Sequence, residues 1–206
     1  MKKPFKILIC LFAFLSLLPL CGCKSAKVEG TYATTSLSAM GLSATQKSFS
    51  SYSENRTETD KNHNTLYKPM QLLFDTQLVL NENKTASLTI FGFESTLNGD
   101  SHYSSVVDEA KSKGYVKNGN LVIENLKWSK DNSQKDTYFV YAVDENDKKM
   151  NLSEIWGEKL FSADHIHARI QNDKLACKIK VCIYEKDDEE KSSVALTTNV
   201  TIIMDK

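Results

Sequence analysis

The sequence predicts an antiparallel all-β fold of about ten strands in a single domain, with one or two short helices. Long stretches of the chain alternate apolar and polar residues, which is the spacing of a strand with one buried face. Short polar turns join most of these stretches, and such turns connect antiparallel neighbours. Because closure removes exposed strand edges, we expect a barrel, with a β-sandwich as the alternative.

The first part of the domain is rich in Ser, Thr and Asn and poor in large aliphatic residues. Thr, Tyr and Phe fit a pleated surface, so we expect strands at residues 30–38 and 45–55. A turn at residues 39–42 would connect them. The polar residues 56–66 are expected to form a solvated loop.

A hairpin is predicted next, because Leu78 and Leu80 are followed across a polar turn by Ala86 and Leu88. Pairing Leu80 with Ala86 and Leu78 with Leu88 puts the aliphatic side chains on one face. This register suits a type I turn followed by a left-handed residue, and that residue is Lys84.

A second hairpin is predicted at Asn118-Gly119, the strongest short-range hairpin signal, between residues 115–116 and 121–123. The segment from Ser104 to Lys113 has the marks of a short helix. It carries acidic residues early and lysines late, and Gly114 follows as a stop signal.

The second half of the domain continues the β pattern. Residues 137–143 form a predicted strand that is apolar on both faces, followed by a polar turn at residues 144–147. Residues 151–161 are compatible with one or two helical turns. The last predicted strand covers residues 194–204, and the acidic run 185–191 before it reads as a solvated turn.

A further hairpin is predicted around Asn172-Asp173, where the alternation of one strand continues in the next. Its register is set by the buried face, since a slip by one residue would turn every side chain over. The expected pairs are Ile170 with Leu175, Ala168 with Cys177 and Ile166 with Ile179.

The N-terminus has the anatomy of a secretory signal, with three lysines, an apolar stretch from Ile7 to Leu20 and a small-residue site. The apolar stretch is shorter than the roughly 20 residues of a membrane-spanning helix. Leu20-Cys21-Gly22-Cys23 resembles the lipobox of bacterial lipoproteins. The resemblance implies a signal peptide at residues 1–22, cleavage between Gly22 and Cys23, and lipidation of Cys23 by fatty acyl chains such as palmitate.

This resemblance also implies a location and an organisation. The protein would be held in the bacterial cell envelope, on a membrane outside the cytoplasm, and on the outer membrane if the cell has two. Residues 23–29 would be a lipidated tether of at most about 20 Å, and residues 30–206 the β-rich domain. Two or three acyl chains make a stable anchor.

Charge and cysteine content limit the possible partners and the redox state of the protein. Residues 1–22 contain three of the 26 basic residues and none of the 26 acidic ones, so the mature chain is slightly acidic. With no basic stripe in the sequence, we expect no nucleic-acid partner. Of the five cysteines, only Cys23, Cys177 and Cys182 remain after cleavage. Cys177 and Cys182 would lie about 16 Å apart in an extended strand, which is too far for a disulfide, so we expect both to be free thiols.

The sequence predicts no enzyme, no cofactor and no metal site. It has no nucleophile elbow, no His-Glu-x-x-His and no glycine-rich phosphate loop. His165 and His167 share one strand face at a metal-ligand spacing. However, the predicted register sets Lys178 and Lys180 opposite them, and cations disfavour a metal ion. We therefore expect an exposed polar strand face there.

Three phrases resemble bacterial lipocalin-like lipoproteins: Gly30-Thr-Tyr32 after the tether, the hairpin from Leu78 to Leu88, and the Asn-Gly hairpin from Gly114 to Ile123. The resemblance implies a lipocalin-like barrel that binds a small hydrophobic or amphipathic ligand. The alternative is a structural or surface-interaction lipoprotein with a filled core and another envelope protein as partner. The ligand residues are unknown. The aromatic side chains available for a cavity or for the core are Tyr32, Tyr52, Phe74, Phe93, Tyr115, Trp128, Tyr138, Phe139, Tyr141 and Trp156.

Overall fold

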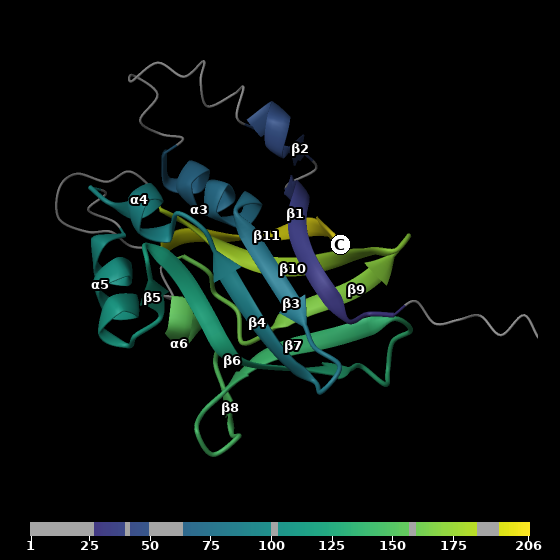
Figure 1. Ribbon diagram of the computed structural model, residues 1–206. Coiled ribbons are helices and arrows are strands. Elements are labelled where there is room, and N and C mark those ends of the chain that lie inside the picture. Colours follow the sequence, from purple (N-terminus) through teal and green to yellow (C-terminus); the bar gives the residue numbers. More distant parts are fainter. Residues whose placement is uncertain (1–26, 40–41, 50–63, 100–102, 157–159, 185–193) are drawn as a thin grey trace, which may run out of the picture.

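The structure is a computed structural model that describes residues 27–39, 42–49, 64–99, 103–156, 160–184 and 194–206 (Figure 1). It is mostly β-structure. The strands are β1 (Gly30–Ala39), β2 (Leu42–Thr45), β3 (Thr76–Leu80), β4 (Thr85–Ile90), β5 (Val116–Lys117), β6 (Asn120–Lys130), β7 (Thr137–Val143), β8 (Lys149–Met150), β9 (Ile166–Gln171), β10 (Lys174–Tyr184) and β11 (Val194–Asp205). The helices are α3 (Asn64–Phe74), α4 (Phe93–Leu97), α5 (Ser104–Ser112) and α6 (Ser153–Trp156).

Eight of the strands form a closed antiparallel barrel. In chain order, β1, β3, β4, β6, β7, β9, β10 and β11 each pair with the next, and β11 returns to pair with β1. This up-and-down order is the one found in lipocalins and other eight-stranded barrels. The predicted barrel is confirmed, and the β-sandwich alternative is excluded because the ring of pairings is continuous.

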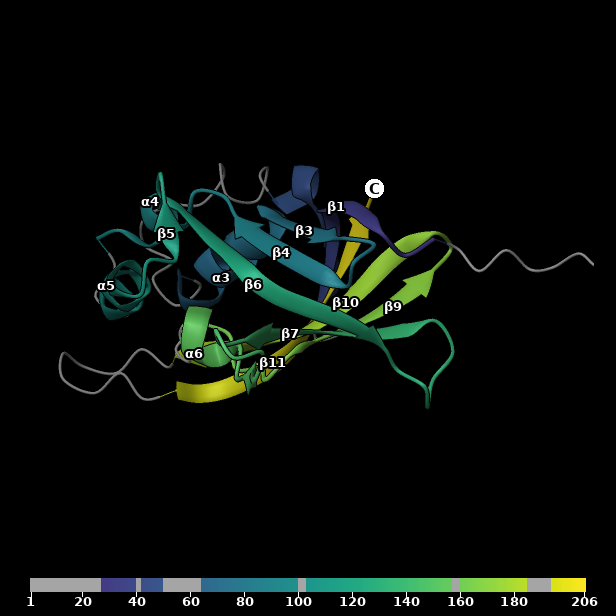
Figure 2. The ribbon, with the colours of Figure 1, turned by 60° about the horizontal axis from the view of Figure 1, so that its bottom comes forward.

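The barrel has two different ends (Figures 1 and 2). At one end, here called the helical end, α3 packs against β1, β10 and α4, and α5 contacts α4 and α6. At the other, the hairpin end, lie the turn between β3 and β4, the turn between β6 and β7 and the turn between β9 and β10. The chain enters β1 and leaves β11 at the hairpin end, so a segment preceding β1 joins the barrel there.

Most of the predicted hairpin pairs form. Leu80 pairs with Ala86 and Leu78 with Leu88, and Ile170 pairs with Leu175 and Ala168 with Cys177. The expected third pair, Ile166 with Ile179, does not form, because the β9–β10 ladder ends at His167 and Lys178. At the Asn-Gly turn, Asn118 and Gly119 have φ of 52° and 77°. Positive φ at both central residues is the mark of a type I′ turn, whose twist matches that of the flanking strands.

Lys84 adopts the left-handed conformation that the hairpin register requires, with φ of 69°. Its ammonium lies 3.6 Å from the centroid of the Trp128 ring and 3.6 Å from the Glu29 carboxylate. The lysine thus occupies a strained backbone position while its side chain covers the ring at the hairpin end.

Backbone strain at Lys84 predicts a specific order of stability for two variants. Lys84→Ala and Lys84→Gly both lose the contacts to Trp128 and Glu29, but only glycine tolerates the left-handed region without cost. We expect Lys84→Gly to be more stable than Lys84→Ala by about 1 kcal/mol, as measured by urea unfolding. Equal stability of the two variants would show that this turn is not strained.

The expected strand at residues 45–55 is wrong. The strand β2 ends at Thr45, residues 46–49 are helical, and residues 50–55 lie outside the described residues. The Ser48 hydroxyl accepts a hydrogen bond from the Thr45 amide, and the Thr45 hydroxyl accepts one from the Ser48 amide. This reciprocal arrangement is that of a capping box, which starts a helix where β propensity alone predicts a strand.

The helices α3 and α4 were also missed. The expected loop at 56–66 ends in α3, which begins at Asn64; residues 56–63 lie outside the described part. Met70, Leu73 and Phe74 have helical spacing and are buried. Pro69 lies inside the helix, and a proline within an apolar pattern normally indicates a helix end. The predicted helix from Ser104 is confirmed as α5, and the helical turns expected at 151–161 include α6.

Candidate functional site

The interior of the barrel is occupied by the chain's own apolar side chains. Trp128 lies edge-on against Tyr138, with ring centroids 5.8 Å apart. Two of the large rings have their polar tips satisfied within the chain: Trp128 Nε1 donates to the Asn81 carbonyl at 2.9 Å, and the Tyr32 hydroxyl donates to the Val28 carbonyl at 2.6 Å. Buried polar groups that are already bonded offer little to a ligand.

The titratable groups inside the barrel are held neutral. Burial raises the pKa of Tyr32 to about 12 and raises the pKa of the Cys177 thiol. The Cys177 sulfur lies 4.0 Å from the Met204 sulfur, which leaves it packed in the core. Because the thiolate is the reactive form of cysteine, Cys177 is unreactive. Cys177 and Cys182 are both buried thiols that form no disulfide, as expected from their spacing.

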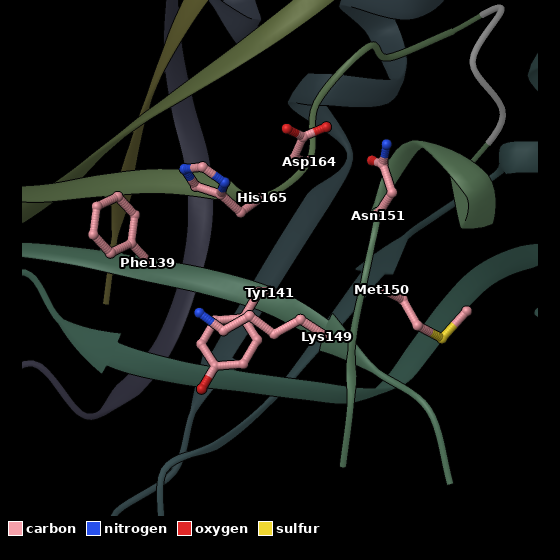
Figure 3. A pocket seen from close by; sticks show the side chains of 7 residues that line it. All are labelled: Phe139, Tyr141, Lys149, Met150, Asn151, Asp164 and His165. Atoms are coloured by element: carbon pink, nitrogen blue, oxygen red, sulfur yellow. The ribbon is translucent and has the colours of Figure 1, made fainter. Parts of the chain in front are cut away.

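A pocket of about 410 Å³ lies outside the barrel, where β7 changes its partner (Figure 3). From Thr137 to Val140 β7 pairs with β9, and at Ala142 and Val143 it pairs with β8. Tyr141 stands between the two pairings. The pocket therefore opens at a split in the sheet.

The split is closed again on its far side by two backbone hydrogen bonds. The Leu152 amide donates to the Asp164 carbonyl at 3.2 Å, and the Ser153 amide donates to the Ala163 carbonyl at 2.9 Å. The helix α6 begins at Ser153, beyond these bonds. The walls of the pocket are thus held by main-chain pairing on both sides, and strand-held walls keep a site preorganised.

Aromatic rings form one side of the pocket. The Phe139 and Tyr141 rings come from β7, and His165 comes from the residue before β9 (Figure 3). The Phe139 ring meets the His165 ring edge-on at 5.0 Å and the His167 ring at 5.4 Å. Packed rings with part of their surface in solvent present a flat apolar face to a ligand.

Polar groups stand around these rings. The Lys149 ammonium lies 4.3 Å from the centroid of the Tyr141 ring. Asn151 and Asp164 lie at the rim away from Phe139 (Figure 3). The Asn151 side-chain oxygen accepts hydrogen bonds from the Ser153 amide and hydroxyl at 3.1 and 2.9 Å, which fixes this side chain at the start of α6. The pocket thus combines apolar faces with a few fixed polar groups, which is the usual composition of a small-molecule site.

The outer face beside the pocket is electropositive. His167 lies opposite Lys178 in the β9–β10 ladder, as the sequence predicts. Partial burial, Lys178 and His165 lower the pKa of His167, against the opposing effect of Asp131. The Asp131 carboxylate accepts hydrogen bonds from the Ser133 amide and hydroxyl at 2.8 and 2.6 Å, which lower its pKa. At neutral pH the His167 imidazole is therefore neutral among cations.

Some of the predicted site residues lie in the described part of the chain, and others lie outside it. The predicted lipidation and cleavage residues, Gly22 and Cys23, lie outside the described residues. His165 and His167 lie on an outer strand face, and no group of three His, Cys, Asp or Glu side chains in the described part of the chain has metal-binding geometry. Tyr52 is likewise outside the described residues.

Sequence reasoning missed the pocket because it forms between three separate segments, residues 139–141, 149–151 and 164–165, whose arrangement depends on the change of partner along β7. A signal was nevertheless present. The alternation along residues 137–143 puts Tyr138 on the inner face and Phe139 and Tyr141 on the outer face, and large rings on the solvent side of a barrel are unusual enough to mark a site.

Of the helices in the described part of the chain, none combines the length and the apolar character needed to cross a membrane. A comparison with known protein families, with curated proteins and with solved structures finds no match to this chain.

Proposed function

We propose that the protein is a lipid-anchored, non-enzymatic binding protein of the bacterial envelope, whose barrel is a rigid scaffold for a small amphipathic ligand. The observation that carries the proposal is the pocket at the split in the sheet, where three aromatic rings and three polar side chains converge in about 410 Å³. We place the ligand in this outer pocket, because the interior is occupied by bonded side chains such as Trp128 and Tyr32.

The chemistry of the pocket supports binding rather than catalysis. The seven lining residues include His165 and Asp164, which could move a proton, but no serine, threonine or cysteine that could act as a nucleophile beside them. Binding energy would come from apolar surface buried against Phe139 and Tyr141, at about 25 cal/mol per Å². Lys149 and Asn151 would fix the orientation of the ligand.

The lipobox resemblance at Leu20-Cys21-Gly22-Cys23 supports the anchor. The barrel begins at Gly30 and receives the preceding segment at its hairpin end. A lipid on Cys23 would therefore hold this end toward the membrane. The pocket lies on the side wall of the barrel. The ligand would therefore enter from the aqueous phase next to the membrane and not from the bilayer.

Native mass spectrometry of the protein extracted from its own membrane tests this proposal. We expect wild-type protein to carry a co-purified small molecule and Tyr141→Ala to lose it, because the alanine variant removes the ring at the centre of the split. Phe91→Ala is the matched control, since Phe91 is an exposed aromatic residue of the helical end. A wild-type protein that repeatedly carries no small molecule would refute the proposal, and an adduct retained by Tyr141→Ala would place the ligand elsewhere, for example inside the barrel.

A further inference from the structure

The outer face next to the pocket carries a cluster of cations that the net charge does not reveal. We call it the cationic face and define it by His165, His167, Arg169, Lys178 and Lys180. Arg169 and the two lysines are exposed, and within the described residues no carboxylate forms an ion pair with any of the three. Elsewhere on the described surface, ion pairs such as those of Lys117 and Lys174 are common. Unpaired like charges on one face disfavour folding slightly and favour an anionic partner.

The ladders place the cationic face in direct continuity with the pocket. Phe139 pairs with His167, and His167 pairs with Lys178. The Ser162 amide donates to the Lys180 carbonyl at 2.9 Å, so Lys180 lies across from the segment that carries Asp164. Directly opposite side chains are about 5 Å apart, and Lys178 and Lys180 are about 7 Å apart along the strand. Charges at this spacing suit a partner with repeating negative charge.

The pocket itself favours a different chemical group from the cationic face. Its aromatic rings offer flat faces to the C–H groups of a sugar ring, and Asp164 accepts hydrogen bonds from hydroxyl groups. An isolated anion would be repelled by Asp164, whereas a sugar has hydroxyl donors to satisfy it. The Lys149 ammonium lies over the Tyr141 ring. It is therefore placed to pair with a carboxylate group of the sugar that occupies the pocket.

We propose that the pocket and the cationic face together bind an acidic polysaccharide, with one sugar ring in the pocket and the carboxylates of the following sugars against Lys178 and Lys180. This inference rests on the proposed function and extends it, since the sugar ring in the pocket would be one unit of a longer acidic chain. A nucleic acid fits less well, because the dense phosphates of its backbone would meet the carboxylates of Asp131 and Asp164.

The test is a binding titration of the full-length, detergent-solubilised protein with three probes: a polygalacturonate oligomer, a neutral dextran oligomer of the same length, and a single-stranded oligothymidylate of the same charge. We expect the polyuronate to bind most tightly and its affinity to fall with added salt. Lys178→Gln/Lys180→Gln should weaken it about tenfold, since each exposed charge pair contributes a modest amount. Tyr141→Ala should weaken it as well.

Lys111→Gln/Lys117→Gln is the matched control, because it removes the same charge from exposed lysines on other elements, α5 and β5. This control should bind the polyuronate within about twofold of wild type. Thermal melting of every variant separates weakened binding from unfolding. A control that weakens binding as much as the Lys178/Lys180 variant would show that only net charge matters, which overturns the inference.

The other outcomes separate the inference from the proposed function. Equal affinity for oligothymidylate overturns sugar recognition. Equal affinity for dextran, with no effect of the Lys178/Lys180 variant, refutes the acidic class but leaves a sugar pocket. If no probe binds while native mass spectrometry shows an adduct that Tyr141→Ala loses, the polysaccharide is refuted and the proposed function stands. If there is also no adduct, both fail.

Discussion

Replacing Trp128 by alanine is expected to lower the free energy of unfolding by about 4 kcal/mol, a large part of the 5–15 kcal/mol that stabilises a typical domain. The Trp128 side chain is only 3% exposed. Its loss leaves a large cavity in the barrel, and a barrel held by hydrogen bonds all round cannot collapse to fill it.

Three contacts of Trp128 are lost together in this variant. The edge-on contact with Tyr138 disappears, the Asn81 carbonyl loses its indole donor, and the Lys84 ammonium loses the ring beneath it. The aromatic contact, the cation–π contact and the indole hydrogen bond contribute about 1 kcal/mol each, since the Asn81 carbonyl still accepts the Lys84 amide and is not left unpaired. Because these terms overlap with the cavity cost, they do not simply add.

Urea unfolding, followed by circular dichroism, measures this effect. Phe91→Ala is the control, since Phe91 is 45% exposed and its truncation should change the free energy of unfolding by less than about 0.5 kcal/mol. Trp128→Phe keeps most of the volume but not the indole donor, so it should fall between wild type and Trp128→Ala. A cost below about 1 kcal/mol for Trp128→Ala would mean that the interior is loosely filled, and a ligand inside the barrel would then become the better explanation of any co-purified molecule.

Much of the barrel could be predicted from sequence, because its turns and hairpin registers are determined by residues that are close together in the chain. The register of the first hairpin follows from the alternation around Leu78 and Leu88, and the left-handed Lys84 follows from the register. The Asn118-Gly119 turn is fixed by residues that tolerate positive φ. Closure of the barrel was expected on general grounds, as a way to remove edges; the pairing of β11 with β1 involves residues too far apart in the chain to be seen locally.

The regions that sequence reasoning misplaced are those where local signals compete. Around Thr45 and Ser48, β propensity predicts a strand, but mutual capping of two backbone amides starts a helix. In α3, the proline at position 69 hides a helical pattern whose apolar residues pack against the barrel. In the first case a local cap decides; in α3 tertiary packing decides, and its contribution exceeds the few tenths of a kcal/mol by which propensities differ.

Only part of the candidate site could be predicted from the sequence. The outer position of His165 and His167, and the placement of Lys178 opposite His167, follow from strand alternation and were predicted. The pocket was not, because it depends on β7 exchanging β9 for β8 on either side of Tyr141. The cationic face was not predicted either, since net charge sums over the whole surface and the spacing of cations in the chain does not show which strands are neighbours.

The barrel holds the chain firmly from residue 27 onward, which shortens the proposed tether. Val28 is buried and its carbonyl accepts the Tyr32 hydroxyl, while Lys27 pairs with Glu82 and its carbonyl accepts the Lys206 ammonium. Four residue steps separate Cys23 from Lys27, which span at most about 14 Å. A lipid on Cys23 would therefore keep the hairpin end of the barrel beside the bilayer.

Replacing Cys23 by alanine is accordingly expected to release the protein from the membrane almost completely. Without its acyl chains the protein loses about 0.8 kcal/mol for each CH₂ group that they bury, and the residues near the tether cannot compensate, because Lys27 is already paired with Glu82. Membrane fractionation of cells that produce each variant measures the effect. Cys21→Ala is the matched control and should remain membrane-bound, since alanine fits the lipobox at that position. Membrane association of Cys23→Ala equal to wild type, or processing that continues when lipoprotein signal peptidase is inhibited, would refute the anchor and with it the placement of the pocket beside the bilayer.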